Sequence, residues 1–186
     1  MRGKSHCQLG NYLVNTYFPQ ISGPYRTAFL LGCIEPDRNP ATYLKGSVRA
    51  QWLRGHNYEN AKYFMGRIAR RLERKKCWNL LDYYTAGKLI HYTVDAFTYA
   101  HNSSFPVSLQ EHKKYEDALQ VYFLRFLQGR GTPEKLPARS VMDTISKHHE
   151  DYLARTPDID RDSRYAFSVC CCVAQMLSCR KAAAAV

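Results

Sequence analysis

The chain has 186 residues, 45% of them hydrophobic, which is enough apolar material for one domain with a sizeable core, so we expect residues 1–186 to form a single domain. Its formal net charge of +11 is unevenly placed, because residues 1–80 hold 14 Lys and Arg against four acids, whereas residues 81–186 hold 13 against 12. No stretch is apolar enough to span a bilayer, and the N-terminal residues do not resemble a secretory signal. These features argue against an integral membrane protein and predict a cytoplasmic one, or one that contacts a membrane only from its surface.

Helical spacing of apolar residues recurs along most of the chain, whereas the period-two alternation typical of strands is scarce. The predicted helices, separated by turns rich in Pro and Gly, span residues 6–18, 24–33, 57–76, 79–101, 109–128, 138–154 and 162–181. We therefore predict an all-α fold, a compact multi-helix bundle.

Two candidate metal ligands lie in the first third of the chain. Asp37 falls in the segment EPDRNP, which is predicted to be a loop, and His56 follows Gly55 at the start of the predicted helix 57–76. Loop and helix-end positions suit side chains that reach into a site built between helices.

The predicted helix 57–76 is amphipathic, with a basic stripe opposite its apolar face. The stripe consists of Arg67, Arg70, Arg71, Arg74 and Lys75. Such a stripe attracts phosphate-rich partners, either anionic lipid or nucleic acid. An ordinary solvated helix face is the alternative, and the sequence favours neither.

Five further candidates are concentrated in residues 87–116. They are His91, Asp95, His101, His112 and Glu116. Two of the His/carboxylate pairs are four positions apart, which places each pair on one face of a helix, where it can chelate an ion. A single pair of this kind often indicates only a hydrogen bond or weak ion pair, but two pairs with a histidine between them favour a metal site. Imidazole plus carboxylate is the ligand set of zinc at open, catalytic positions.

Cysteine offers no competing metal site. The seven cysteines include no CxxC pair, and their odd number is a poor disulfide framework, so we expect a reducing compartment. The run Cys170–Cys172 could carry lipid or sense oxidation, but packing within a terminal helix is the favoured interpretation. His148 and His149 lie outside the metal pattern and are expected on the surface of a late helix.

The ordered spacing of these residues matches a known family. The string His91-x3-Asp95-x5-His101-x10-His112-x3-Glu116, preceded by Asp37 in a G-x3-PD context and by Gly55-His56, resembles the zinc-dependent phospholipases C over about residues 5 to 128. The segment HKKYE is similar to the HxKYE segment of the secreted bacterial enzymes. The resemblance implies an all-helical fold of the phospholipase C and single-strand nuclease type, with zinc ions in a cleft, and hydrolysis of the phosphodiester between diacylglycerol and the head group.

Carried over residue by residue, the resemblance implies up to three zinc sites. His56, His91, Asp95 and Asp37 would hold the first ion, and His101, His112 and Glu116 the second. A third ion would lie between Asp95, acting as a bridge, and His6. Asp37 is also the catalytic candidate that would position or deprotonate the attacking water.

The third site is where the chain departs from the family pattern. The secreted enzymes expose an N-terminal tryptophan whose amine and carbonyl bind that zinc, whereas here Met1 to Ser5 precede His6, and Trp52 and Trp78 lie far along the chain. The sequence therefore leaves open whether two or three ions are bound, and whether a different group completes the third site.

Zinc lowers the pKa of bound water from about 15.7 to about 7, so the resemblance implies direct attack by a metal-bound hydroxide on a phospholipid or another phosphodiester. The single-strand nucleases share the scaffold but usually carry a Gly-Gly-Asn segment in place of HKKYE, which makes nucleic acid the less favoured substrate. A third interpretation is a catalytically degenerate, metal-stabilised binding module. The pattern carries no information on the oligomeric state.

Overall fold

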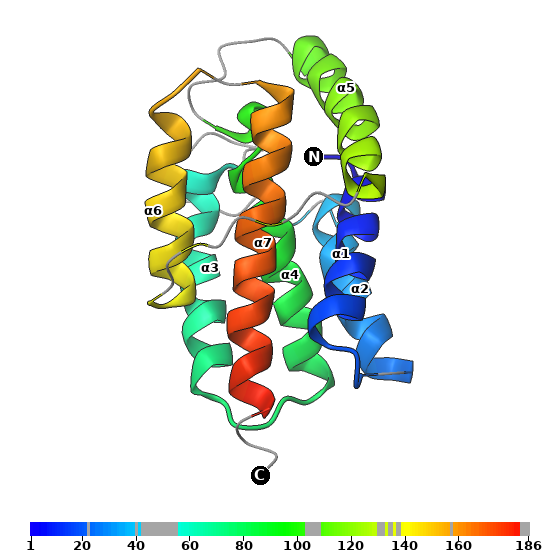
Figure 1. Ribbon diagram of the computed structural model, residues 1–186, viewed down its shortest axis with the longest axis vertical. Coiled ribbons are helices and arrows are strands. Elements are labelled where there is room, and N and C mark those ends of the chain that lie inside the picture. The colour runs from blue at the N-terminus through cyan, green and yellow to red at the C-terminus, as the bar shows by residue number, and fades with distance from the viewer. Residues whose placement is uncertain are drawn as a thin grey trace.

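Helices provide the regular secondary structure in the computed structural model, which describes residues 1–21, 23–39, 41, 56–102, 109–129, 133, 136, 139–156 and 158–182 (Figure 1). The helices are α1 (Gly3–Tyr17), α2 (Gly23–Arg38), α3 (Tyr58–Arg74), α4 (Leu80–Ala96), the short 3-10 helix η2 (Tyr99–His101), α5 (Leu109–Gln128), α6 (Val141–Leu153) and α7 (Ile159–Ala182). Within the described ranges there is no strand, so the predicted all-α fold is confirmed. None of the described helices is long and apolar enough to cross a membrane.

All seven predicted helices are present, but two of their ends differ from the prediction near the candidate ligands. The predicted helix 24–33 continues through Pro36 to Arg38, so Asp37 lies in the last turn of α2 and not in a loop. The predicted helix 79–101 ends at Ala96, and His101 lies on the separate helix η2. At this end of α4 the Thr98 hydroxyl donates to the carbonyl of Val94, which gives a terminal carbonyl a side-chain partner.

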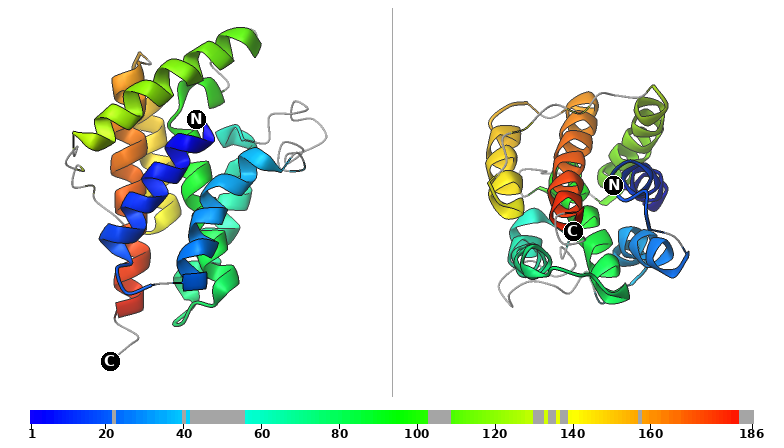
Figure 2. Two further views of the ribbon diagram at one scale, coloured as in Figure 1. Left: turned by 90° about the vertical axis from the view of Figure 1, so that its right-hand side faces the viewer. Right: turned by 60° about the horizontal axis from the view of Figure 1, so that its bottom comes forward.

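Helix α4 lies at the centre of the bundle, in contact with α1, α2, α3 and α7 (Figures 1 and 2). All its residues from 89 to 96 are buried, including His91 and Asp95. A helix that is buried all round is normally apolar, and a carboxylate placed there needs partners inside the protein. Asp95 must therefore find its hydrogen-bond and ionic partners inside the bundle.

Two glycines allow α2 to approach α4 closely. A Cβ atom at Gly32 would collide with the backbone carbonyl of Tyr84, and one at Gly87 with that of Phe29. Only glycine leaves room for two helix backbones at this separation. The close crossing matters for the site, since Asp37 follows on α2 and His91 follows on α4.

Two residues of the basic stripe on α3 form ion pairs with the start of α4. Asn79 and Asp82 form a capping box, and the buried Asp82 carboxylate also pairs with Arg71 at 2.5 Å and with Lys75 at 2.8 Å. Burial raises the pKa of Asp82, but these two cations, with the Asn79 backbone, bring the pKa below its ordinary value. Two of the five stripe residues are therefore structural.

Helices α6 and α7 cover the other side of α4, and here one prediction is wrong. His148 and His149 are buried and not on the surface, with exposed fractions of 8% and 3%. They face inward because α6 packs against both α3 and α7, and the ring of His149 stacks on Tyr58 with centroids 3.7 Å apart. On α7, Cys170 and Cys171 are buried in the core, as the packing interpretation predicted.

Candidate metal centre

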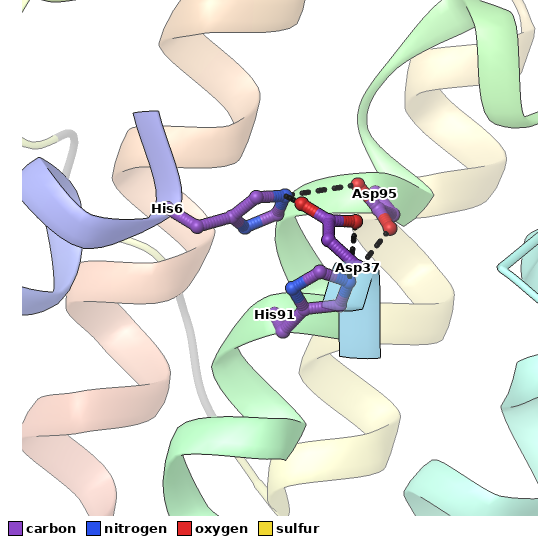
Figure 3. Close-up of side chains that lie close together, drawn as sticks. All are labelled: His6, Asp37, His91 and Asp95. Carbon is purple, nitrogen blue, oxygen red and sulfur yellow. Dashed lines mark ion pairs between the residues drawn. The ribbon is translucent and has the colours of Figure 1, made fainter. Parts of the chain in front are cut away.

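The eight predicted ligands converge at one end of α4. They are His6, Asp37, His56, His91, Asp95, His101, His112 and Glu116. Among them, two groups have ligand atoms within 4.8 Å of one another: His6 with Asp37, His91 and Asp95, and His101 with His112 and Glu116. Figure 3 shows how the four side chains of the first group point toward one another from α1, α2 and α4.

Asp95 lies at the centre of the arrangement, and its two carboxylate oxygens face different partners. Oδ2 is 3.1 Å from Nε2 of His91 and 3.1 Å from Nδ1 of His56. Oδ1 is 3.3 Å from Nε2 of His6 and 3.7 Å from Nε2 of His101. A carboxylate placed in this way can bridge two metal ions, one on each oxygen.

Asp37 reaches the same histidines from the end of α2. Its Oδ1 is 3.6 Å from Nε2 of His91 and 3.7 Å from Nδ1 of His56, and its Oδ2 is 4.0 Å from Nε2 of His6. Oδ2 is buried and has no hydrogen-bond partner among the described residues. Because a buried carboxylate oxygen is costly to leave unsatisfied, it marks a place where a cation or an ordered water fits.

The protonation of His91 is fixed by a backbone group. Its Nδ1 lies 2.9 Å from the carbonyl oxygen of Cys33, which can only accept a hydrogen bond, so Nδ1 carries a proton. In the neutral imidazole the lone pair is then on Nε2, which faces Asp95 and His56. Metal-binding histidines are typically oriented in this way by the other ring nitrogen.

The second group is more open to solvent than the first. Nε2 of His101 is 3.0 Å from Oε1 of Glu116, and Nε2 of His112 is 3.7 Å from the same oxygen. The side chains of His112 and Glu116 are 28% and 17% exposed, whereas those of His91 and Asp95 are fully buried. The open side of the centre therefore lies toward α5.

Met1 is a contributor that the sequence analysis missed. Its α-amino nitrogen is 2.8 Å from Oδ1 of Asp95, 2.9 Å from Nε2 of His101 and 2.9 Å from Oε1 of Glu116. Its carbonyl oxygen is 3.0 Å from Nε2 of His6. A pattern of side chains cannot reveal a backbone ligand, and the only signal was the short distance in sequence between His6 and the first residue.

Electrostatics at Met1 show how strongly the centre attracts a cation. Burial alone would lower the pKa of the α-amino group, but the carboxylates of Asp95, Glu116 and Asp37 raise it to about 11. Burial would likewise raise the pKa of Asp95, yet His101 and the Met1 amine hold it well below its ordinary value. Asp95 is therefore ionised at neutral pH, as a carboxylate that binds a metal must be.

The donor set fits zinc. Burial would lower the pKa of His91, but the charge of Asp95 raises that pKa above its ordinary value. Without a metal, the imidazole of His91 therefore tends to hold a second proton, which lies between His91 and Asp95. A zinc ion would take the place of that proton. Imidazole nitrogens and carboxylate oxygens that converge from several helices are ligands that zinc prefers.

Comparison with known proteins gives one match. The family model described as zinc dependent phospholipase C matches residues 5–163, a range that includes all eight predicted ligands. No curated protein and no solved structure matches the chain.

Proposed function

The chain belongs to the zinc-dependent phospholipase C family, and from this premise we propose that it hydrolyses the phosphodiester between a lipid and its phosphorylated head group. The family match supports phosphodiester hydrolysis in general, and the phospholipid substrate is the finer part of the proposal. The observation that carries it is the convergence of two His/carboxylate groups on the buried carboxylate of Asp95. A site of this kind can hold several ions close enough to act on one phosphate.

We assign three zinc ions to the centre. The first would be held by His56, His91, Asp37 and Asp95, and the second by His101, His112 and Glu116. Asp95, His6, and the carbonyl and deprotonated amine of Met1 would hold the third. In this proposal the backbone of Met1 takes the role that the terminal tryptophan has in the secreted enzymes.

Bound zinc supplies a water molecule of lowered pKa and positive charge to neutralise the phosphate in the transition state. The water oxygen attacks phosphorus, the bond from phosphorus to the diacylglycerol oxygen breaks, and that oxygen takes a proton, which gives an alcohol and a phosphomonoester. Asp37 is placed to orient the water, because its side chain is 23% exposed while His91 and Asp95 beside it are fully buried. Its buried Oδ2 atom accepts no hydrogen bond from a described residue.

The basic stripe supports a separate proposal of peripheral contact with an anionic membrane. Arg67, Arg70 and Arg74 remain exposed on α3, whereas Arg71 and Lys75 pair with Asp82. Arg74 lies near the start of α4, and Asp95 follows Leu80 by 15 positions, about 22 Å along that helix. The stripe would therefore attach the protein to a surface at a distance from the metal centre and would not present the substrate.

The proposed function is tested with purified, tag-free protein. Zinc content is measured by elemental analysis, and turnover is measured on a chromogenic phosphocholine diester and on single-stranded DNA, each with and without chelator. We expect three zinc ions per chain and chelator-sensitive turnover of the phosphocholine diester, and two ions would argue against the third site. Turnover of DNA alone would support the nuclease alternative, and zinc without any turnover would support the binding module.

Two substitutions refine this test. Asp37→Asn should retain most of the zinc and lower turnover by about 100-fold or more, which begins at the lower end of the range for a group that transfers a proton. Glu150→Gln removes an exposed carboxylate on α6, away from the metal centre, and should leave both the zinc content and the turnover unchanged. A protein that binds no metal after reconstitution with zinc would overturn the assignment of these histidines.

A further inference from the structure

Asp162 is a buried carboxylate on α7 that belongs to neither group of metal ligands. Its side chain is fully inaccessible, and three hydrogen bonds end on it. Oδ2 accepts from the backbone N–H of Tyr99 at 2.8 Å and from the hydroxyl of Tyr115 at 2.8 Å. Oδ1 accepts from the hydroxyl of Tyr152 at 2.6 Å.

The two donors to Oδ2 belong to the two elements that carry the second ligand group. Tyr99 is the first residue of η2, which ends at His101. Tyr115 lies on α5 between His112 and Glu116. A single carboxylate oxygen therefore joins the element that bears one ligand to the element that bears the other two.

This junction fixes a separation on which metal binding depends. His101 and Glu116 come from different elements, and their ligand atoms are 3.0 Å apart. Figure 2 shows α5 lying across the end of the bundle at the side where the N-terminus is marked, so its position is set by packing on α1 and α7. A rotation or shift of α5 relative to η2 would separate the ligands without unfolding either element.

A second contact holds the other end of η2. The side-chain amide of Asn102 donates to the carbonyls of Ala96 and Thr98, and Nε2 of His149 donates to its Oδ1 at 2.8 Å. The residues on each side of His101 are thus attached to α6 and α7. Packing on α1 and α7 holds α5 in place, and Asp162 adds a hydrogen-bonded connection between α5 and η2.

We propose that Asp162 is a positioning residue of the second zinc site, which holds His101 against His112 and Glu116 by joining η2 to α5. The inference rests on the proposed zinc centre. Burial, and then the charge of Asp162, raise the pKa of both Tyr115 and Tyr152 well above the ordinary value, so both phenols stay protonated and donate. Residues that orient metal ligands from outside the ligand set typically change metal affinity by about 10–100-fold when they are replaced.

The test compares two substitutions at one position. Asp162→Asn keeps a carbonyl oxygen for Tyr99 and Tyr115, and its amide group can donate to the hydroxyl oxygen of Tyr152, so the junction is retained. Asp162→Leu has a similar size but accepts no hydrogen bond. Zinc affinities are measured by chelator competition at pH 8, two units above the pKa of about 6 to which burial raises Asp162.

We expect the Leu variant to bind the ion of the second site about 10–100-fold more weakly, with the other ions bound as in the wild type, and the Asn variant to restore the affinity. The absorption spectrum of the cobalt-substituted protein provides a second measurement, because it reports the ligand geometry of each site independently of activity. If Asp162 only stabilised the fold, the Leu variant would bind all of the ions more weakly or all of them as tightly as the wild type.

Two tyrosine variants keep the test decisive if the Leu variant does not fold. Tyr115→Phe removes only the hydroxyl that joins α5 to Asp162, and should weaken the second site several-fold. Tyr152→Phe is the matched control, since it removes a hydrogen bond to the same carboxylate from an element without ligands, and should leave the affinity unchanged. Equal zinc affinities in wild type, Asp162→Leu and Tyr115→Phe would overturn the proposal. A wild-type protein that binds no zinc would overturn the proposed function itself.

Discussion

The first residue of the chain enters the metal centre through its backbone. Its α-amino nitrogen contacts Asp95, His101 and Glu116, and its carbonyl contacts His6. An added residue would convert the amine into an uncharged amide and would have to pass through a buried region, where the side chain of Met1 is 1% exposed. We therefore expect binding of the proposed third ion to require a free amine at this position.

We predict that a Gly-Ser extension ahead of Met1 removes one zinc per chain and lowers turnover at least 10-fold, the lower bound typical for a disturbed metal site. The same extension at the other end of the protein is the control. Intact-mass spectrometry establishes where each chain begins, and elemental analysis counts the zinc. Unchanged zinc content in the extended protein would rule out the amine as a ligand.

At the scale of helices, the position of Asp37 depends on how closely α2 approaches α4. Gly32 and Gly87 lie at the crossing, where each faces the backbone of the other helix. The Asp37 carboxylate comes within 3.6 Å of His91 because the two helices are in direct backbone contact. We therefore expect the proposed first zinc site to respond to a single methyl group at this crossing, one helical turn from His91.

Gly87→Ala should destabilise the fold by about 1–3 kcal/mol, since the methyl group forces the helices apart, and should weaken the first zinc site relative to the second. Gly66→Ala is the control, because a Cβ there meets Met142 at an ordinary 3.8 Å and should stabilise α3 by about 0.5–1 kcal/mol. Urea unfolding and zinc titration measure the two effects. Equal stability of the two variants would contradict the role of the crossing.

The helices and two of the candidate His/carboxylate pairs could be predicted from the sequence because both depend on local spacing. Apolar periodicity gave all seven helices, and the four-residue spacing of His91 and Asp95 placed both side chains on one face of α4. The end of α2 could not be predicted, because a proline usually marks the limit of a helix and here the helix continues past Pro36.

Contacts between distant segments were beyond the reach of such patterns. The backbone groups of Met1 carry no residue-type signal, and the junction at Asp162 joins residues that are far apart in the chain. The burial of His148 and His149 depends on the orientation of α6 against α3 and α7, which spacing alone does not determine. The sequence therefore identified candidate ligands that lie close together in the fold, but not the contacts that position them.

At the scale of the whole molecule, three parts of the chain meet at His149. This residue of α6 stacks on Tyr58 of α3 and donates to Asn102, which follows η2. Burial lowers the pKa of His149 from 6.5 to about 4, because the charged imidazolium is excluded from this interior. In the unfolded chain the imidazole has a pKa near its ordinary value. Folding lowers that pKa and therefore favours the neutral form of His149.

The sign of the resulting pH dependence follows from this difference. The contribution of His149 to stability is complete above about pH 6.5 and is lost as the pH falls toward 4, because the unfolded chain then binds a proton that the folded protein excludes. We predict that metal-free wild type loses about 2 kcal/mol more than His149→Gln between pH 7.5 and 4.5. Urea unfolding in chelator at both pH values measures this difference, and NMR titration of the imidazole gives the pKa directly. A stability difference that stays constant with pH would show that His149 titrates normally and that α3, α6 and η2 do not form a closed interior around it.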